Sequence, residues 1–263
     1  MTPDFSFIRD DSPLILVCND DGVDAPGIIA LAEAIQGLGQ LVVVAPVDQQ
    51  SAVGHAISIR MPLRARPWAF KADVGTALAV TGTPADCIKL AVSTLLPRKP
   101  DLVVSGINQG PNTAVNVIYS GTVAAAVEAS ILGIDAIAFS HCHWTNADYS
   151  TSKQVARKIV DQVLTKGLPN GVCLNVNIPA VSSAELRGMR ITRQARSRWE
   201  ESFDARVDPF GRPYYWLSGD FVDLDKDDAT DLHAVEQAYV SVTPIRHDLT
   251  AHSFLDDLTQ WSL

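Results

Sequence analysis

The first two thirds of the chain alternate between short apolar runs and segments with helical spacing of apolar residues. Short apolar runs are typical of strands that are buried on both faces of a sheet. They lie at 14–18, 41–45, 102–104, 136–139 and 172–178. Helical spacing predicts helices at 26–39, 84–96, 121–132 and 152–166. This repeated strand–helix order predicts an α/β fold: a three-layer, Rossmann-like arrangement around a mostly parallel sheet.

Two regions depart from this alternation. Residues 56–80 contain Pro62, Pro67, Gly75 and several arginines, which favours a β-ribbon and loop over a core strand. From about residue 180, arginine-rich loops, prolines and short aromatic strands replace the strand–helix order. We therefore predict a Rossmann-like core over 1–180 and a β-rich C-terminal annex over 181–263 within the same domain.

Composition and charge narrow the possible partners. The chain has 263 residues, of which 47% are hydrophobic and 19% charged, which excludes a disordered chain. Twenty-one Lys and Arg against thirty Asp and Glu leave a net charge of −9, and no basic stripe is visible, so no nucleic-acid duplex is expected as a partner. An anionic substrate would need local attraction from a metal ion or from backbone amides at a helix N-terminus.

The sequence also predicts where the protein resides. The longest apolar stretch, 114–140, is interrupted by Glu128 and Asp135, so no membrane segment is expected. The first residues lack the basic and apolar segments of a secretory signal. Four scattered cysteines without a C-x-x-C motif favour the reducing cytoplasm. The sequence 141–143 (His-Cys-His) invites a metal interpretation, but adjacent residues rarely converge on one ion without ligands from elsewhere.

Polar side chains follow several predicted strands, and the carboxyl ends of parallel strands meet at one edge of a sheet. Asp20 and Asp21 come directly after the first strand, with no Lys or Arg nearby in sequence. A divalent cation would relieve the repulsion between their carboxylates, and oxygen donors from Asp, Ser and Asn suit hard ions such as Mg²⁺ or Mn²⁺. On spacing alone, a turn with a helix cap explains this Asp-Asp-Gly sequence equally well.

A second candidate lies at the start of the Ala-rich helix. Ser120, Gly121 and Thr122 stand at its first turn, where free N–H groups and hydroxyls would make an anion cradle suited to phosphate. An ordinary N-cap explains the same residues. Residues 81–87 offer another helix start with the same two interpretations.

Other motifs are weaker. His55 follows Gly54 and could act as a general acid or make a plain polar contact. The acidic run 223–227 imitates the start of an EF-hand loop but lacks its glycine and its final glutamate. We predict a solvated acidic loop there, followed by a short helix. Neither a Walker A sequence nor a G-x-G-x-x-G sequence is present, so a dinucleotide cofactor has little support.

Together these residues resemble the SurE family, the stationary-phase survival protein and metal-dependent nucleotidase. The resemblance lies in the order and spacing of many short motifs along most of the chain, each of which would be weak alone. The motifs lie at 19–27 (NDDGV and APG), Ser51, 82–87 (GTPADC), 105–108 (SGIN), Gly110, Asn112, 119–123 (YSGTV), 174–179 (LNVNIP), 208–211, 215–217 (YWL) and 242–244 (VTP).

The resemblance implies a phosphatase that hydrolyses nucleoside 5′-monophosphates, and also 3′-monophosphates, with one divalent cation per subunit. The metal ligands that it implies are Asp20, Asp21, Ser51 and Asn108. The phosphate cradle that it implies consists of Asn112, Ser120, Gly121 and Thr122. As catalytic residues, Asp20 and Asp21 would act either as the base for a metal-activated water or as the nucleophile that forms a phospho-enzyme. The family also implies a homodimer or homotetramer with exchanged C-terminal segments, which would explain the annex as an oligomerisation element with a β-hairpin and a swapped tail.

Two positions depart from the family pattern. Pro46-Val47-Asp48 stands where the family usually has Pro-Asp-Arg before the loop serine, and Asp24 replaces a frequent histidine. An arginine that could meet phosphate is therefore missing. This leaves a catalytically weakened nucleotide-binding stress protein as an alternative, and a metal hydrolase acting on another ester or amide as a third hypothesis.

Overall fold

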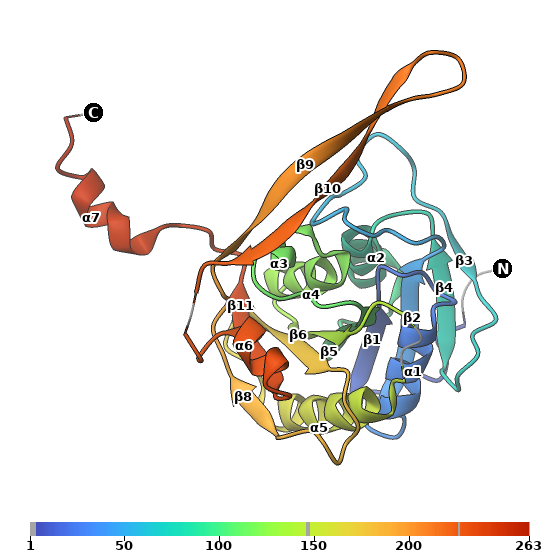
Figure 1. The fold of residues 1–263 in the computed structure, drawn as a ribbon. Helices are drawn as coiled ribbons and strands as arrows, with labels where there is room; N and C mark the ends of the chain where they lie inside the picture. The colour runs from blue at the N-terminus through green and yellow to red at the C-terminus, as the bar shows by residue number, and fades with distance from the viewer. Residues whose placement is uncertain (1–3, 146–147, 226, 263) are drawn as a thin grey trace.

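A large mixed sheet with helices on both faces organises residues 4–145, 148–225 and 227–262, which the computed structural model describes (Figure 1). The sheet has nine strands in the order β3-β4-β2-β1-β5-β6-β7-β11-β8. Its strands are β1 (Leu14–Cys18), β2 (Gln40–Pro46), β3 (Ala65–Pro67), β4 (Thr76–Val80), β5 (Leu102–Gln109), β6 (Asp135–Cys142), β7 (Val172–Pro179), β8 (Met189–Ile191) and β11 (Val240–Arg246). All neighbouring pairs are parallel except β3–β4 and β7–β11, so the predicted three-layer, mostly parallel α/β fold is confirmed.

Helices form the outer layers. They are α1 (Pro26–Ile35), α2 (Pro84–Leu90), α3 (Asn116–Tyr119), α4 (Gly121–Ile131), α5 (Ser150–Lys166), α6 (Asp231–Glu236) and α7 (Leu255–Leu258), with a π-helical turn η1 (Ala91–Leu95) and a 3₁₀ turn η2 (His252–Phe254). Helices α1 and α5 pack against each other on one face of the sheet, and α2 and α4 pack on the other. The helix predicted over 84–96 is thus divided into α2 and η1.

Strand β1 shows why a strand that is buried on both faces has an unbroken apolar sequence. Successive side chains of a strand point to opposite faces. In β1, Ile15 and Val17 join the core on the α1–α5 side, while Leu14, Leu16 and Cys18 join the core on the α2–α4 side. All five are fully buried. Burying a large aliphatic side chain contributes about 1.5–3 kcal/mol, so both faces of the strand require apolar residues.

The prediction that residues 56–80 contain no core strand is wrong. Strand β4 lies parallel to β2 inside the sheet, and its last four residues, 77–80, are buried. The breakers Pro62, Pro67 and Gly75 all precede β4, and two of the three lie outside any strand. The exposed strand β3 carries Pro67 at the edge of the sheet, where a missing N–H is tolerated. Because β4 has only five residues, the prolines and arginines before it outweigh its short apolar run in the sequence pattern.

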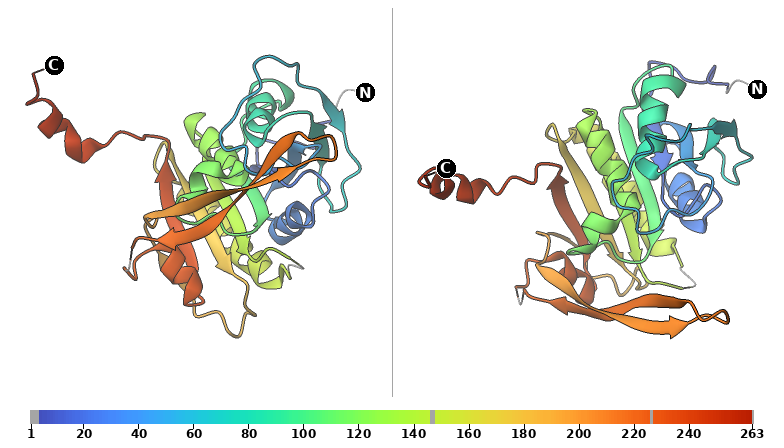
Figure 2. Two further views of the ribbon diagram at one scale, coloured as in Figure 1. Left: turned by 45° about the horizontal axis from the view of Figure 1, so that its top comes forward. Right: turned by 90° about the horizontal axis from the view of Figure 1, so that it is seen from above.

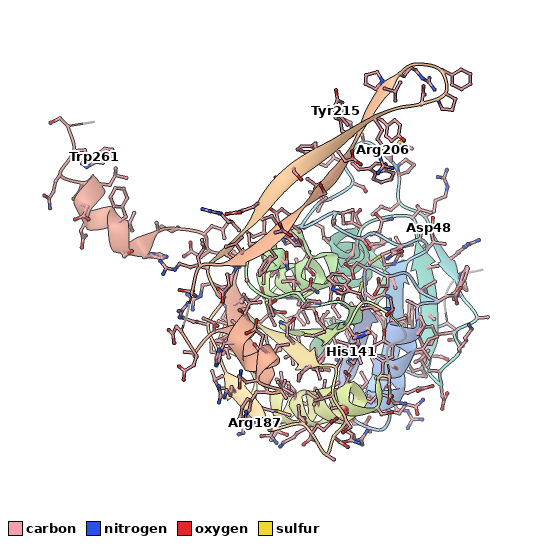
Figure 3. The ribbon with its side chains drawn as sticks, in the orientation of Figure 1. Asp48, His141, Arg187, Arg206, Tyr215 and Trp261 are labelled. Carbon is pink, nitrogen blue, oxygen red and sulfur yellow. The ribbon has the colours of Figure 1, made fainter. Side chains whose placement is uncertain are left out.

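The C-terminal part of the chain contributes to the sheet and also extends away from it. Strands β9 (Ser197–Val207) and β10 (Pro213–Asp223) pair antiparallel over their full length to form a separate hairpin, which lies across one edge of the body (Figure 2). A tail that carries α7 projects from the end of β11. Figure 3 shows Tyr215 and Arg206 on the hairpin and Trp261 on the tail, apart from the body. The second, C-terminal sheet confirms the predicted β-rich segment.

The described residues contain no helix with the length and apolar character that would be needed to span a bilayer. The expectation that the chain has no secretory signal concerns the N-terminal segment, of which residues 1–3 lie outside the described residues.

Candidate active site

The polar clusters that follow the parallel strands converge on one cavity of about 430 Å³. Fourteen of the described residues line it. They come from the segments that follow β1, β2 and β6, from the end of β5 and the segment after it, from α3 with the residue that caps α4, and from β9 of the hairpin. The cavity therefore lies outside the carboxyl ends of the strands, where open α/β sheets bind ligands. Of the site residues predicted from the sequence, the cavity brings together Asp20, Asp21, Ser51, Asn108, Asn112 and Ser120.

The two aspartates lie in a tight turn after β1. Asn19 donates from Nδ2 to the carbonyl of Gly22 (2.8 Å), and Gly22 takes a left-handed φ of +100°, a conformation that glycine adopts without steric cost. The turn is also tied to the segment after β2, because the Gln50 N–H donates to the Asp20 carbonyl (2.7 Å). Helix α1 begins after Ala25 with no side-chain cap. The aspartate side chains are thus in a turn, as one alternative held, but neither of them caps the helix.

Ser51 and Asn108 approach the aspartates from two other strands. Ser51 lies in the exposed segment after β2 and accepts a hydrogen bond from Gln49 Nε2 (2.8 Å). The same Gln49 amide also reaches Asp21 Oδ1 (3.3 Å). Asn108 lies near the end of β5, beyond a shift in the β5–β6 register between Ser105 and Asn108. Such irregularities redirect side chains next to functional sites.

Burial determines the electrostatics of the aspartate pair. Asp20 is 5% exposed, and this burial raises its pKa to about 6, against the hydrogen bond from Thr122 that lowers it, while the charge of Asp21 raises it further. Burial also raises the pKa of Asp21, and hydrogen bonds from Gln109 and Gln49 oppose that effect. No Lys, Arg or His is among the described residues that line the cavity. The part of the chain that the structure describes therefore places no cationic partner beside the pair in this cavity.

The donor set fits one hard divalent cation. Asp20 and Asp21 supply carboxylate oxygens, and Ser51 and Asn108 supply a hydroxyl and an amide oxygen to the same cavity. Asn108 donates its Nδ2 to the carbonyl of Gly110 (2.9 Å), which leaves its Oδ1 for a cation. Mg²⁺ and Mn²⁺ prefer such all-oxygen sites. Among the described residues, no three His, Cys, Asp or Glu side chains form a metal cluster, so the two neutral oxygens are needed to complete this site.

The start of α4 is compatible with both interpretations given above, an N-cap and an anion cradle. Only Ser120 of its first residues lines the cavity, however. The Ser120 hydroxyl accepts from the Val123 N–H (3.1 Å) and is an N-cap, and it also lines the cavity. Thr122 is fully buried, and its hydroxyl donates to Asp20 Oδ1. Gly121 lies so close that a Cβ there would be 2.7 Å from Asp20 Cβ. Gly121 and Thr122 thus contact an aspartate, and their side-chain positions do not line the cavity.

Asn112 is held by a buried amide network. Its N–H donates to Asn177 Oδ1 (2.8 Å), and its Nδ2 donates to Ser140 Oγ (2.8 Å). Its carbonyl accepts from Asn175 Nδ2 (2.8 Å). These partners lie on β6 and β7, so the sheet itself positions the loop after β5 at the cavity floor. Because Asn112 already donates its Nδ2 to Ser140, its side chain is oriented before any substrate binds.

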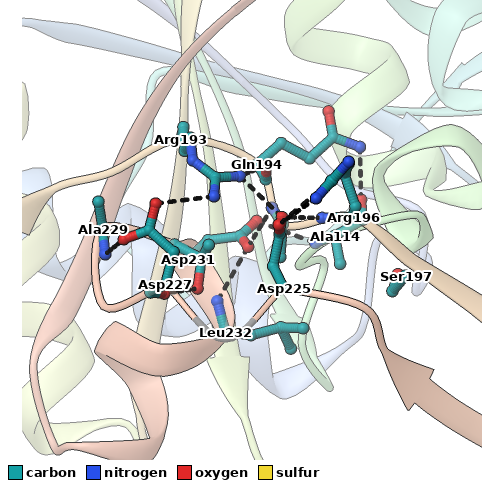
Figure 4. Close-up of polar contacts among 12 residues, drawn as sticks. Ala114, Arg193, Gln194, Arg196, Ser197, Asp225, Asp227, Ala229, Asp231 and Leu232 are labelled. Carbon is teal, nitrogen blue, oxygen red and sulfur yellow. Dashed lines mark hydrogen bonds and ion pairs between the residues drawn. The ribbon is translucent and has the colours of Figure 1, made fainter.

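The hairpin is anchored beside the cavity by a carboxylate cluster (Figure 4). Asp231 is fully buried and accepts hydrogen bonds from the N–H groups of Ala114, Ala195 and Leu232, each at 2.9 Å. Ala114 precedes α3, and Ala195 precedes β9. A single side chain therefore joins the two segments that carry Asn116 and Trp199 into the cavity.

Asp225 strengthens the same junction. It is 6% exposed and pairs with Arg193 (2.8 Å) and Arg196 (3.1 Å). A hydrogen bond from Arg193 holds the pKa of Asp225 well below its usual range. The predicted solvated acidic loop is therefore wrong for this residue, because two arginines from the segment before β9 draw it inward. The short helix predicted after the loop is α6.

Sequence reasoning missed the aromatic side of the cavity. Tyr119, Trp144 and Trp199 line it, although only Tyr119 belongs to a motif. Trp144 lies after β6 and Trp199 lies in the hairpin, so they are separated by 55 positions and no periodic pattern connects them.

Other candidate residues lie elsewhere. His55 pairs with Glu128 at 2.8 Å and does not line the cavity. His141 contacts Ser152 Oγ through Nδ1 (3.0 Å) and is buried (Figure 3).

Thr83 and Asp86 form a capping box at α2, so the N-cap interpretation of 81–87 is confirmed. Asp24 accepts from Trp68 Nε1 (2.9 Å), and Asp48 is exposed.

Comparison with known proteins gives consistent matches. A family model described as "Survival protein SurE" matches residues 15–201. A protein named 5′-nucleotidase SurE from Christiangramia forsetii is 51% identical over 253 residues, which cover 95% of this chain and 97% of that protein. Another with the same name from Flavobacterium psychrophilum is 50% identical over 252 residues, with 95% and 98% covered. The crystal structure of the SurE protein from Aquifex aeolicus superimposes with a TM-score of 0.81 at 41% identity and covers 94% of this chain and 98% of that one.

Proposed function

The chain belongs to the SurE family and is a 5′-nucleotidase, and we propose that it hydrolyses nucleoside 5′-monophosphates to nucleoside and phosphate at the cavity that contains Asp20 and Asp21. One observation carries this assignment of the site. Two adjacent carboxylates lie in a cavity with no cationic side chain among its described lining residues. A phosphate dianion can therefore bind there only together with a cation.

We propose that Asp20, Asp21, Ser51 and Asn108 hold one divalent cation per subunit, Mg²⁺ or Mn²⁺. Such a cation, when bound, offsets the charge that develops on the phosphoryl oxygens. The N-terminus of α4 provides N–H groups and a favourable dipole for the remaining oxygens. Asn112, already oriented by Ser140, lines the same cavity. Phosphate is thereby directed to the polar floor of the cavity, by which we mean the proposed cation ligands together with Asn112 and Ser120. A 3′-monophosphate presents the same group, so we extend the proposal to these substrates.

Two routes for bond cleavage are compatible with these residues. In one, Asp20 or Asp21 accepts a proton from a water, the water oxygen bonds to phosphorus, and the bond from phosphorus to the ribose oxygen breaks. The ribose oxygen takes up the proton from the aspartate and leaves as the nucleoside hydroxyl. In the other, an aspartate oxygen bonds to phosphorus while the bond to the ribose oxygen breaks, and that oxygen takes a proton from water and leaves as the nucleoside hydroxyl. A second water then cleaves the phosphoryl-aspartate, which releases phosphate and restores the carboxylate. Acid quenching during turnover distinguishes them, because only the second route leaves an acid-stable, hydroxylamine-sensitive phosphoryl group on the protein.

The test is phosphate release from adenosine 5′-monophosphate with Mg²⁺ or Mn²⁺, with and without EDTA. We expect activity that EDTA removes and that either cation restores. Asp20→Asn should lower kcat/KM by about 10² or more while the fold is retained. Asp161→Asn is the matched control, because Asp161 is exposed on α5 and does not line the cavity. Full activity in EDTA, or in Asp20→Asn, contradicts the proposal.

The missing arginine favours a second candidate function. Asp48 stands in the segment before Ser51 where the family pattern has an arginine, and no arginine is among the described lining residues. A catalytically weakened nucleotide-binding protein would bind adenosine 5′-monophosphate and the cation in calorimetry but release no phosphate. Turnover in the assay above excludes it.

We also propose that the protein is a cytoplasmic homodimer or homotetramer. The hairpin and tail expose many large apolar side chains, among them Phe203, Phe210, Trp216, Phe254 and Trp261, and contiguous exposed apolar surface is typical of contact sites. The division of the chain at residue 180 and the exchange of the tail between subunits stay predictions. Light scattering of the full chain and of a chain ending at 247 tests them, since a shared tail predicts a smaller assembly for the shorter chain.

A further inference from the structure

Two tryptophans stand at the rim of the cavity, and the proposed hydrolysis does not use them. Both Trp144 and Trp199 line the same cavity as Asp20 and Asp21. Trp144 is 70% exposed and Trp199 is 41% exposed. Exposed indole rings at the mouth of a polar cavity are typical of ligand contacts, since such large apolar surfaces are otherwise buried.

Trp199 is held in place by its surroundings. Its Nε1 donates to Asn116 Oδ1 (3.0 Å), and its ring meets Phe221 edge-on with centroids 5.3 Å apart. The carboxylate cluster around Asp231 further anchors the start of its strand. Because its N–H is already occupied, the indole offers a ligand its ring surface and no hydrogen bond. A ring that is positioned in advance loses little entropy when a ligand stacks on it.

Trp144 reaches the cavity over a glycine. A Cβ at Gly110 would lie 2.4 Å from the Trp144 ring, and Gly110 has a φ of +117°, so only glycine permits this position of the ring. Gln109 Nε2 also donates to the Trp144 carbonyl (2.6 Å). Both contacts come from the last residue of β5 and the residue directly after it, next to Asn108. The same strand end therefore positions a proposed metal ligand and an aromatic ring.

We propose that Trp144 and Trp199 form the nucleobase subsite of this enzyme, an inference that rests on the proposed function. The polar floor binds the phosphate, and the tryptophan rim then meets the other end of the nucleotide. Stacking on aromatic rings accepts every base, because every base has a π-face. The subsite therefore favours nucleotides over phosphate esters without a base, and purines over pyrimidines because a purine covers more of the rings.

The test compares KM for adenosine 5′-monophosphate and for ribose 5-phosphate, which lacks the base. Trp144→Ala and Trp199→Ala should each raise KM for the nucleotide by about tenfold, with KM for ribose 5-phosphate changed less than about twofold. Trp144→Phe and Trp199→Phe keep a ring and should restore most of the lost affinity. Trp216→Ala is the control for an exposed tryptophan outside the cavity, because Trp216 is 60% exposed on β10 and does not line the cavity; light scattering checks that this variant keeps the wild-type assembly. An equal rise for both substrates, or no rise for the nucleotide, overturns the subsite.

A second measurement separates this inference from the proposed function. Adenosine has no phosphate, so its binding depends on the rim alone. In a chain with Trp68→Phe, Trp216→Phe and Trp261→Phe, the two rim tryptophans are the only tryptophans left, and excitation at the long-wavelength edge of indole absorption keeps the tyrosines dark. We expect adenosine to quench this fluorescence even if hydrolysis fails. Hydrolysis of nucleotides without quenching by adenosine overturns the subsite and leaves the proposed function intact.

Discussion

The hydroxyl of Thr122 controls the charge of Asp20, so its removal should weaken cation binding in a pH-dependent way. Thr122 is fully buried and donates to Asp20 Oδ1. Valine has nearly the same shape and no donor. Burial raises the pKa of Asp20 to about 6, and the Thr122 hydrogen bond is the largest influence that lowers it. In Thr122→Val that opposing influence disappears, and the pKa must rise further.

The magnitude follows from the strength of the lost bond. A hydrogen bond to a charged group contributes about 1.5–3 kcal/mol, and 1.36 kcal/mol corresponds to one pKa unit. The pKa of Asp20 in the metal-free variant should therefore be about 7 to 8. With a pKa of about 7.5, Asp20 is roughly one quarter ionised at pH 7, against roughly nine tenths in the wild type. A cation must then displace a proton, so its apparent affinity falls by the ratio of these fractions.

The assay is calorimetric titration of the metal-free protein with Mn²⁺ at several pH values. We expect the Kd of Thr122→Val to exceed the wild-type Kd by about fifteenfold at pH 6, about fourfold at pH 7 and hardly at all at pH 8.5. Thr122→Ser retains the hydroxyl and should follow the wild-type profile. A loss of affinity that is the same at every pH, or an equal loss in Thr122→Ser, refutes the reasoning.

Three further predictions concern the surroundings of the site. Gly121→Ala places a Cβ 2.7 Å from Asp20 Cβ; the displaced carboxylate should lower kcat/KM by about 10- to 100-fold, and unchanged kinetics would contradict the assigned contact. Asp231→Ala leaves three buried N–H groups unpaired, so we expect a loss of about 3 kcal/mol or more and a Tm lower by roughly 6–12 °C in calorimetry. Burial raises the pKa of Glu128, but its two basic partners outweigh that effect and lower it. Its contribution to stability is thus present above the unfolded pKa of about 4.3 and disappears as the pH falls through the lower folded value. Thermal unfolding between pH 6 and pH 3 should show a shallower acid loss for Glu128→Gln, and parallel curves would disprove this.

Much of the fold could be predicted because its strands are buried on both faces. An unbroken run such as 14–18 is needed wherever helices cover both sides of a strand. Strand β4 was missed for a local reason: its few residues follow a stretch rich in proline and arginine, and only the pairing with β2 makes them a strand. A pattern of a few consecutive residues carries no information about which distant strand they pair with.

The polar half of the site was also accessible from the sequence. Asp20, Ser51, Asn108 and Ser120 each follow a strand or begin a helix, and strand ends in a parallel sheet share one edge. The role of Thr122 was not accessible. Its hydroxyl was assigned to phosphate by its position at the helix start, whereas the packing of α4 against the turn after β1 directs it to Asp20.

The sequence by itself therefore determined the doubly buried strands of the core other than β4, their alternation with helices along the chain and the oxygen-rich edge, because each is encoded in a few consecutive residues. Only the tertiary structure decided which aromatic rings complete the cavity. Trp144 is set by Gly110, which directly follows β5, and Trp199 is set by a hairpin that Asp231 ties to Ala114, 117 positions before that aspartate. Such contacts depend on where distant segments meet in space, and hydrophobic periodicity reports only which face of an element is buried.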